Sequence, residues 1–250
     1  IRPRDWSSDV CSSDLQSSKR DIVAQMGVQE DRLHIVPVGV DEDIFRPMPD
    51  VARVPGRLMT TASADVPLKG LTYLIEALAK VRAEREDAHL VVIGRPRHKS
   101  AVPAQLKRLG LEGAVEFVSG VSDERIVELY AEAELAVVPS LYEGFSLPAI
   151  EAMCTGICLV ATDGGALPEV TGRDGDTVLQ CKAGDAEGLA ATIRRGLDDA
   201  DLRARIGAAG RQRVVERWSW KHCAQLTVDQ YREVLAMPQN VAKLRANGRI

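Results

Sequence analysis

The sequence lacks any apolar run that approaches the roughly 20 residues needed to span a bilayer, which excludes a membrane-spanning protein. Its N-terminus is polar where a secretory signal peptide would be apolar, so no signal peptide is predicted. The cysteines are odd in number and irregularly spaced, in a chain too long to need disulfide staples. We therefore predict a reduced, cytoplasmic protein; its cysteines are Cys11, Cys154, Cys158, Cys181 and Cys223.

The sequence also lacks the phosphate-binding loops of two large enzyme classes. No Gly-x-Gly-x-x-Gly or Walker loop follows a predicted strand, which argues against a dinucleotide oxidoreductase and a P-loop ATPase. Cys154 and Cys158 have no second pair of metal ligands, so we predict core residues there. No histidine has a recognisable ligand or nucleophile partner; the four are His34, His89, His98 and His222.

The composition is that of an ordinary globular chain, because 45% of its residues are apolar and 27% are charged. The net charge of −4 does not indicate a nucleic-acid partner. The charges are uneven: the last fifty residues hold ten Lys and Arg against four acids, and the first 200 hold 22 against 32. This basic tail lacks interleaved aromatic residues. Its Trp218, Trp220 and Tyr231 stand at near-helical spacing, which predicts that they pack the tail down.

Residues 1–15 differ from the rest of the chain. The tripeptide SSD occurs at 7–9 and again at 12–14, without the apolar periodicity of a helix or strand. The stretch RPRDWSSDVCSSDL resembles the translated read-through of a sequencing adapter, and a flexible natural terminus is the alternative. We expect a foreign or disordered segment without functional residues, and we expect that the natural N-terminal part is missing.

From residue 16 onward, strand and helix patterns alternate. Apolar residues at helical spacing predict an amphipathic helix over 71–81. The continuous apolar run at 89–93 is typical of a strand buried on both faces of a parallel sheet. Repeated units of this size predict an α/β fold with a Rossmann-like, doubly wound parallel sheet. Further strands are predicted over 58–61, 115–118, 135–138 and 157–161, and further helices over 104–109, 123–131 and after Pro148, Pro168 and Asp185.

In such sheets, ligands bind beyond the carboxyl ends of the strands, so the loops there are candidates for function. The segment SLYEGFSLPAIEAM (140–153) follows an apolar strand and leads into a helix. The helix N-terminus near Leu147 presents unpaired N–H groups, which form a ready site for phosphate. Glu143 and Glu151 lie eight positions apart and are predicted to face one cleft, where a carboxylate accepts hydrogen bonds from sugar hydroxyls.

The string EGFSLPAIEAM (143–153) is far more specific than two glutamates at this spacing. It stands in order with GVDEDIF (39–45), PLKGL (67–71), EFVSGVSDERIVELYAEAELAVVPS (116–140) and GGALPEV (164–170). With these motifs the chain resembles, from about Ser17 to Tyr231, the C-terminal lobe of the retaining GT-B glycosyltransferases of the glycosyl transferases group 1 family. The resemblance implies transfer of a sugar from a nucleotide diphosphate sugar to an acceptor, with retention of the anomeric configuration.

The resemblance implies two catalytic residues. Lys69 would contact the donor diphosphate, whose charge grows as the glycosidic bond breaks. Glu143 would hold hydroxyls of the donor sugar, and Glu151 would accept hydrogen bonds from the ribose. The remaining donor-binding positions would act through their backbone; they are Gly94, Val121, Gly144, Phe145, Ser146 and Leu147.

The chain departs from the family pattern at one place. The family has Gly-Arg five residues before the lysine, where the arginine also grips the diphosphate, and this chain has Ser63 and Ala64. Arg57 precedes its strand and is predicted to lie at the wrong end of the sheet. Arg95 and Arg97 follow a strand at the correct end and are candidate diphosphate contacts, with solvated surface arginines as the alternative.

The resemblance also implies the domain organisation. Residues 16–48 would be a remnant of the acceptor lobe and the lobe junction, 49–215 the nucleotide-sugar-binding domain, and 216–250 C-terminal helices that return toward the other lobe. Because an active site of this fold lies between two lobes, we expect this chain alone to bind donor without transferring sugar.

We expect neither a cofactor nor a metal ion. The strings Asp41-Glu42-Asp43 and Asp174-Gly175-Asp176 match the Asp-x-Asp metal motif of a different glycosyltransferase fold, but acid-rich loops produce this motif by chance. The expected partners are a nucleotide sugar and an unknown acceptor, which could be a glycan, a lipid or a small molecule. No nucleic acid is expected, and peripheral membrane association stays open. Three alternatives remain: a GT-B sugar-nucleotide epimerase, a non-catalytic nucleotide-sugar-binding module and, least favoured, a NAD-binding oxidoreductase.

Overall fold

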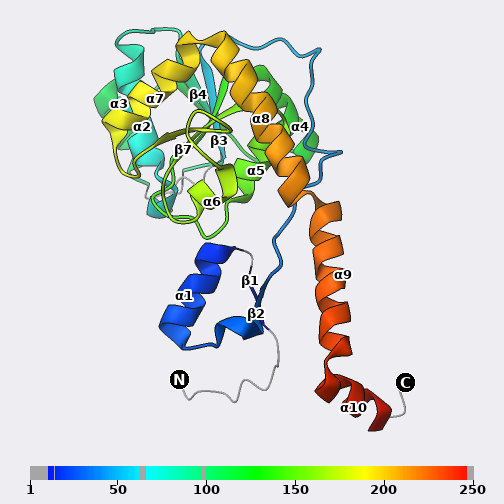
Figure 1. Ribbon diagram of the computed structural model, residues 1–250. Coiled ribbons are helices and arrows are strands. Elements are labelled where there is room, and N and C mark those ends of the chain that lie inside the picture. Colours follow the sequence, from blue (N-terminus) through cyan, green and yellow to red (C-terminus); the bar gives the residue numbers. More distant parts are fainter. Residues whose placement is uncertain (1–10, 14, 62–65, 97–99, 247–250) are drawn as a thin grey trace. The chain divides into compact units, whose positions relative to one another are not determined.

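The computed structural model describes residues 11–13, 15–61, 66–96 and 100–246 (Figure 1). The chain divides into two compact units. Residues 40–216 form the larger unit, and residues 1–39 together with 217–250 form the smaller one. The positions predicted at 63, 64, 97 and 98 lie outside the described residues.

The larger unit is built on a six-stranded parallel sheet with the strand order β5-β4-β3-β6-β7-β8. The chain winds outward from the centre in one direction and then in the other, which is the doubly wound order predicted from the sequence. The register aligns Arg57 with His89 and Thr61 with Ile93, so β3 and β4 end together. The strands are β3 (Arg57–Thr61), β4 (His89–Ile93), β5 (Val115–Val118), β6 (Leu135–Val138), β7 (Cys158–Thr162) and β8 (Leu179–Cys181).

Helices cover both faces of this sheet (Figure 1). One face carries α2 (Leu71–Arg82), α3 (Val102–Leu109) and α7 (Ala186–Asp198), of which α2 and α7 pack against each other. The other face carries α4 (Asp123–Glu132), α5 (Leu147–Cys154), α6 (Leu167–Thr171) and the part of α8 (Ala200–Trp218) that belongs to this unit. A short 3-10 helix, η2 (Pro67–Lys69), precedes α2.

The apolar patterns of the sequence account for this core. All the residues of the stripe predicted on α2 are buried. Each residue of β6 and β7 is buried, as expected for central strands covered by helices on both faces. Asp185 caps α7 as predicted, because its Oδ1 accepts hydrogen bonds from Glu187 N and Gly188 N at 3.0 and 2.9 Å. The predicted α/β class and parallel sheet are therefore confirmed.

The smaller unit contains a pair of short parallel strands and several helices. Its elements are β1 (Cys11–Ser13), α1 (Gln16–Met26), the 3-10 helix η1 (Glu30–Arg32), β2 (Leu33–Ile35), α9 (Trp220–Ala236) and α10 (Pro238–Ala246). The expectation that residues 1–15 contain no strand is wrong for Cys11–Ser13, which pair with Leu33–Ile35. Strand pairing uses main-chain groups, so it does not require the side-chain periodicity on which the expectation rested.

The aromatic residues of the C-terminal tail behave differently from one another. Trp218 is only 7% exposed, as expected for a residue that packs the tail down. Trp220 and Tyr231 are 53% and 66% exposed, so the expectation is wrong for these two side chains. Both project from one face of α9, because about eleven residues make three helical turns.

In the described part of the chain, none of the helices combines the length and the hydrophobicity that crossing a membrane requires.

The glycine that joins η2 to α2 generates a prediction about stability. Gly70 has a φ of +68°, and a Cβ atom there would overlap the carbonyl oxygen of Pro139. Gly110 ends α3 with a φ of +66°, and a Cβ atom there meets no other atom within 4 Å. Gly110→Ala should lower the free energy of unfolding by about 1 kcal/mol, because only the left-handed backbone is strained. Gly70→Ala should lower it by roughly 2 kcal/mol more, because the backbone of the next loop must also move.

Urea denaturation of the two variants beside the parent chain measures both free energies. Equal losses in the two variants would contradict the close approach of Gly70 to the loop after β6.

Candidate functional site

The strand order places the candidate site at the centre of the sheet. β3 and β6 are neighbours, and the helices that follow them, α2 and α5, lie on opposite faces. The loops that leave the carboxyl ends of these two strands therefore separate and leave a crevice, where ligands of doubly wound sheets bind. Lys69 lies in the connection after β3, and Glu143 lies in the loop after β6.

The two predicted catalytic residues meet across this crevice. Lys69 Nζ donates a hydrogen bond to Glu143 Oε1 at 2.7 Å, and the two side chains are 32% and 9% exposed. Ser140 Oγ donates to the same oxygen at 2.7 Å, and Ser140 is itself buried. Glu143 Oε1 is thus held by an ammonium group and a hydroxyl group. Among the described residues, nothing donates a hydrogen bond to Glu143 Oε2, which leaves this oxygen for a ligand.

Backbone hydrogen bonds fix the loop that carries Glu143. Leu141 N donates to Leu68 O at 2.7 Å, which ties the loop to the connection after β3. Ala166 N donates to Glu143 O at 2.9 Å, which ties it to the loop after β7. Thr162 Oγ1 donates to the carbonyl oxygen of Ser140. The position of the Glu143 carboxylate is therefore set by both neighbouring loops.

The N-terminus of α5 opens into the same crevice with a strained backbone. Ser146 precedes the helix with a φ of +94°, and it is the non-glycine residue with a positive φ in the described chain. Its Oγ is buried and has no hydrogen-bond partner among the described residues. Strained backbone and orphaned buried hydroxyls are typical of ligand sites. A Cβ atom on the neighbouring Gly144 would meet nothing within 4 Å, so space lies open there.

Glu151 lies on the second turn of α5 in a different environment from Glu143. Burial, and then the negative charge of Asp123 on α4, raise its pKa from 4.5 to about 7. No side chain of the described residues forms an ion pair or hydrogen bond with this carboxylate. The Tyr130 hydroxyl, whose pKa is raised mainly by burial, lies close enough to Glu151 to feel its charge and shares a hydrogen bond with Thr61 Oγ1 at 3.2 Å. Glu151 is therefore an unsatisfied acceptor beside the carboxyl end of β3.

The other predicted positions lie on the loops at this edge of the sheet. Gly94 ends β4 and donates its N–H to Val118 O at 2.7 Å, and Val121 is half-buried in the loop after β5. Arg95 is exposed. Arg57 begins β3 at the opposite edge and pairs with Glu132, as expected for a residue at the wrong end of the sheet. The ligand contacts of Gly94, Val121 and Arg95 stay predictions.

Two residues of this region, Ser140 and Asp123, were not predicted from the sequence as part of the site. Ser140 stands three positions before Glu143 inside the segment 140–153, so a short-range hydrogen bond between the two side chains could have been predicted from the sequence. Asp123 could not be predicted in this way, because only the folded chain brings its charge near Glu151.

The two acidic strings that match a metal motif make local hydrogen bonds instead. Asp41 Oδ1 accepts a hydrogen bond from Asp43 N, and Asp174 Oδ1 accepts one from Gln180 N.

Comparison with known proteins bears on this site. The pattern of the family described as "Glycosyl transferases group 1" matches residues 53–213, which contain every residue of the site. The "MMP alpha-(1->4)-mannosyltransferase" of Mycolicibacterium hassiacum is 42% identical over 220 residues, which cover 88% of this chain and 53% of that protein. The "D-inositol 3-phosphate glycosyltransferase" of a Nocardioides species is 32% identical over 250 residues, which cover 91% of this chain and 54% of that protein.

A solved structure shows the same fold. The crystal structure of Anabaena HepE in complex with UDP matches with a TM-score of 0.82 and 22% identity. The match covers 90% of this chain and 64% of that one. The present chain thus spans about half the length of the curated relatives that it matches.

The raised pKa of Glu151 predicts how stability depends on pH. The folded-state pKa of about 7 lies above the unfolded value of 4.5, so the folded chain retains this proton while the unfolded chain releases it. The contribution of Glu151 to stability is therefore present at low pH and is lost as the pH rises from 4.5 to about 7. In Glu151→Gln this loss is absent. At about 1.4 kcal/mol per pKa unit, the variant should gain up to roughly 3 kcal/mol over the parent between pH 4.5 and 8.

Urea denaturation of both proteins at several pH values measures this difference, in which the other titrating groups cancel. A difference that is constant from pH 5 to pH 8 would show that the Glu151 carboxyl has an ordinary pKa.

Proposed function

Because the chain belongs to the glycosyl transferases group 1 family, we propose that it provides the donor site of an enzyme that transfers a sugar from a nucleotide diphosphate sugar to an acceptor, with retention of the anomeric configuration. The observation that carries the proposal is the contact of Lys69 with Glu143 across the crevice, 2.7 Å long. One cation and one carboxylate with a free oxygen stand there beside a helix N-terminus. These are the groups that a diphosphate and a sugar require.

The diphosphate would lie between Lys69 and the N-terminus of α5. The Lys69 ammonium has three donors and gives one of them to Glu143, which leaves two for phosphate oxygens. The backbone N–H of Leu147 at the start of α5 has no partner among the described residues, and the Ser146 hydroxyl beside it is unpartnered and buried. The three kinds of donor converge where charge develops on the leaving group, so the site stabilises the transition state more than the ground state.

The sugar would contact Glu143. Since Lys69 and Ser140 occupy Oε1, the free Oε2 would accept hydrogen bonds from sugar hydroxyls. The ribose would contact Glu151, whose carboxylate has no partner among the described residues. Ribose hydroxyls would favour the charged form of Glu151 and so lower its pKa on binding. Gly94 and Val121 would line the nucleotide through their backbone, and Arg95 stays a candidate contact for the diphosphate.

The chemical step needs no covalent enzyme nucleophile. The bond between the anomeric carbon and the phosphate oxygen breaks, and its electron pair stays on the phosphate, which Lys69 and the Leu147 N–H stabilise. The acceptor oxygen attacks on the same face of the sugar and passes its proton to the leaving phosphate, which gives retention. We include no metal ion, since Lys69 and the helix N-terminus supply the positive charge that the leaving group needs.

Two observations on related proteins support this reaction class. The relative that is 42% identical is named as a mannosyltransferase. HepE, which shares the fold, was crystallised in complex with UDP. The acceptor stays open among glycans, lipids and small molecules, since the chain spans about half the length of those relatives.

We also propose that the enzyme works in the cytoplasm, because Cys154, Cys158, Cys181 and Cys223 are free.

The proposal predicts nucleotide binding by this chain. A nucleoside diphosphate should bind, and Glu151→Ala should weaken binding about 10- to 150-fold through lost hydrogen bonds to the ribose. Gly144→Ala should fold as stably as the parent, since its Cβ meets no protein atom, but should obstruct a ligand that approaches the backbone of α5. Calorimetry with UDP, GDP and ADP measures each affinity, with Gly113→Ala as the matched control at a second open glycine. Unchanged nucleotide affinity in both Glu151→Ala and Gly144→Ala would contradict a donor site at α5.

A second prediction separates the sugar from the diphosphate. Glu143→Gln should weaken binding of the sugar nucleotide about tenfold while leaving the nucleoside diphosphate affinity nearly unchanged, because the partner of Glu143 is the sugar. Ser140→Ala should have a smaller effect in the same direction, because it removes one of the two donors that hold Oε1. The ratio of the two affinities, measured by calorimetry for each variant, is the readout. Equal losses for both ligands would assign Glu143 to the diphosphate instead.

A further inference from the structure

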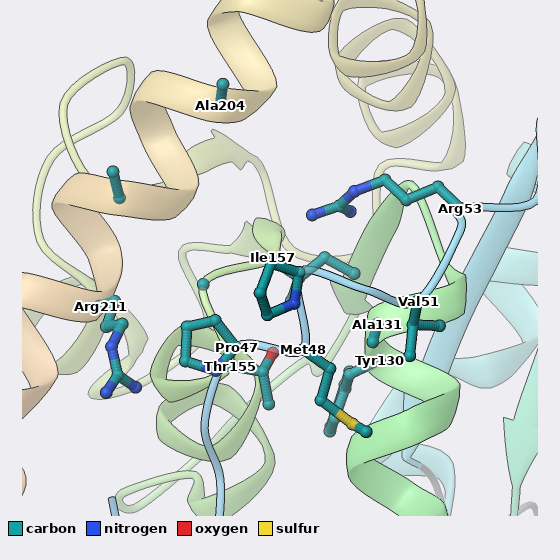
Figure 2. Close-up of a pocket in the computed structure, with 13 residues that line it drawn as sticks. Pro47, Met48, Val51, Arg53, Tyr130, Ala131, Thr155, Ile157, Ala204 and Arg211 are labelled. Carbon is teal, nitrogen blue, oxygen red and sulfur yellow. The ribbon is translucent and has the colours of Figure 1, made fainter.

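A cavity of about 350 Å³ lies at the edge of the sheet opposite the donor site. Its walls are the segment that leads into β3, the end of α4, the turn between α5 and β7, and the small-residue face of α8. None of the residues assigned above to the donor site lines it. Figure 2 shows Ala204 and Arg211 on the α8 helix at one side of the cavity, Arg53 and Val51 at the other side, and Pro47, Thr155 and Ile157 along the wall between them.

The sequence explains why this space is not filled by side chains. Ala204 and Ala208 face the cavity from successive turns of α8, and a Cβ atom on Gly207 between them would overlap the carbonyl oxygen of Gly156. The helix backbone therefore approaches the α5–β7 turn closely, while its alanines leave room beside the contact. Pro47 and Pro49 stiffen the opposite wall. The cavity therefore lies between an exposed proline-containing segment and the exposed alanines of α8, and it has the volume of a small-molecule site.

The charged side chains that line the cavity are all positive. The lining contains two arginines and no carboxylate. Arg211 Nη1 donates to the carbonyl oxygens of Cys154 and Phe45, and its Nε and Nη2 have no partner among the described residues. Arg53 Nη1 donates to Ala133 O at 2.6 Å, but its Nε and Nη2 have no partner among the described residues. Burial and the nearby charge of Arg203 lower the pKa of Arg53, and the Glu134 carboxylate, which pairs with Arg203, raises it. The two guanidinium groups thus share one carboxylate, and an anion on the exposed Arg53 side chain would balance the second positive charge.

We propose that this cavity binds a small amphipathic anion, with its carboxylate or phosphate on Arg53 and its apolar part against Ile157, Pro47 and the alanines of α8. A planar or short apolar group fits the flat, small-residue walls. The guanidinium fork suits a carboxylate or phosphate head, which accepts two parallel hydrogen bonds.

The cavity is joined to the donor site through α5. This helix has eight residues, so its two ends are about 12 Å apart. Ser146 at its N-terminus belongs to the donor site, and Thr155 after its C-terminus lines the cavity. Arg211, also in the lining, binds the carbonyl oxygen of Cys154 in the last turn. A bound anion that shifts the C-terminal end of α5 would also shift the Leu147 N–H at its other end, which would make the anion an effector of nucleotide binding.

Calorimetry with the whole chain tests the site. The probes are phenyl phosphate and benzoate, with inorganic phosphate and benzyl alcohol as controls for the head and the ring alone. We expect at least one of the two amphipathic anions to bind with a Kd on the order of 1 mM or below, and both controls to bind at least tenfold more weakly. Failure of both anions to bind, or equal binding of the controls, would overturn the proposal.

Variants locate the bound probe. Ala208→Phe should fill the cavity and abolish binding, whereas Ala191→Phe, at an exposed alanine of α7 outside the lining, should not change it. Arg53→Gln should weaken binding about tenfold. Lys69→Ala should leave it unchanged, and loss of probe binding in that variant would assign the probe to the donor site and overturn the proposal.

The effector role rests on the proposed function and has its own readout. Saturating probe should change the affinity for a nucleoside diphosphate about fivefold, and the nucleoside diphosphate should change the affinity for the probe by the same factor. Ala208→Phe should remove this coupling. Probe binding without any nucleotide binding would remove the proposed function and leave the cavity site standing. Independent binding of both ligands would overturn the effector role alone.

Discussion

The ion pair between Lys69 and Glu143 lies in the crevice at the centre of the sheet, and the other groups of the site are arranged around this ion pair. It joins the connections after β3 and β6, two neighbouring strands whose following helices lie on opposite faces. Gly70 lets the first connection approach the carbonyl oxygen of Pro139, and Leu141 N donates to Leu68 O. Removing two charged groups from water costs free energy, and their mutual attraction offsets this cost only when their geometry is well fixed. The backbone contacts of the two connections provide that fixed geometry.

The same crevice leaves several polar groups unsatisfied in the protein itself. Glu143 Oε2, the Ser146 hydroxyl and the Glu151 carboxylate have no hydrogen-bond partner among the described residues. Ser146 adds a strained backbone at the helix N-terminus. The buried Ser146 hydroxyl without a partner reduces stability, and a ligand that hydrogen-bonds with it would remove that cost. These groups lie together on the loop after β6 and on α5, which supports a donor site in this crevice.

Much of the fold could be predicted because its signals are local. The buried runs of β4 and β6 and the stripe of α2 gave their elements within one or two residues, and Asp185 gave the start of α7. β8 was not predicted, because three residues, one buried and two half-buried, are too few to show a period. The exposure of Trp220 and Tyr231 was also missed, since spacing gives the face of a helix but not whether anything covers that face.

The class of fold, the family resemblance and the positions of Lys69, Glu143 and Glu151 could be predicted from the residues alone, because each depends on short stretches of the chain. How these groups interact depends on the tertiary packing. It brought Lys69 and Ser140 to the same oxygen of Glu143 and placed Asp123 beside Glu151, and it opened a cavity along the alanines of α8. These contacts join residues from different elements, and the packing of layers sets the distances, charges and burial between them, which no local pattern encodes.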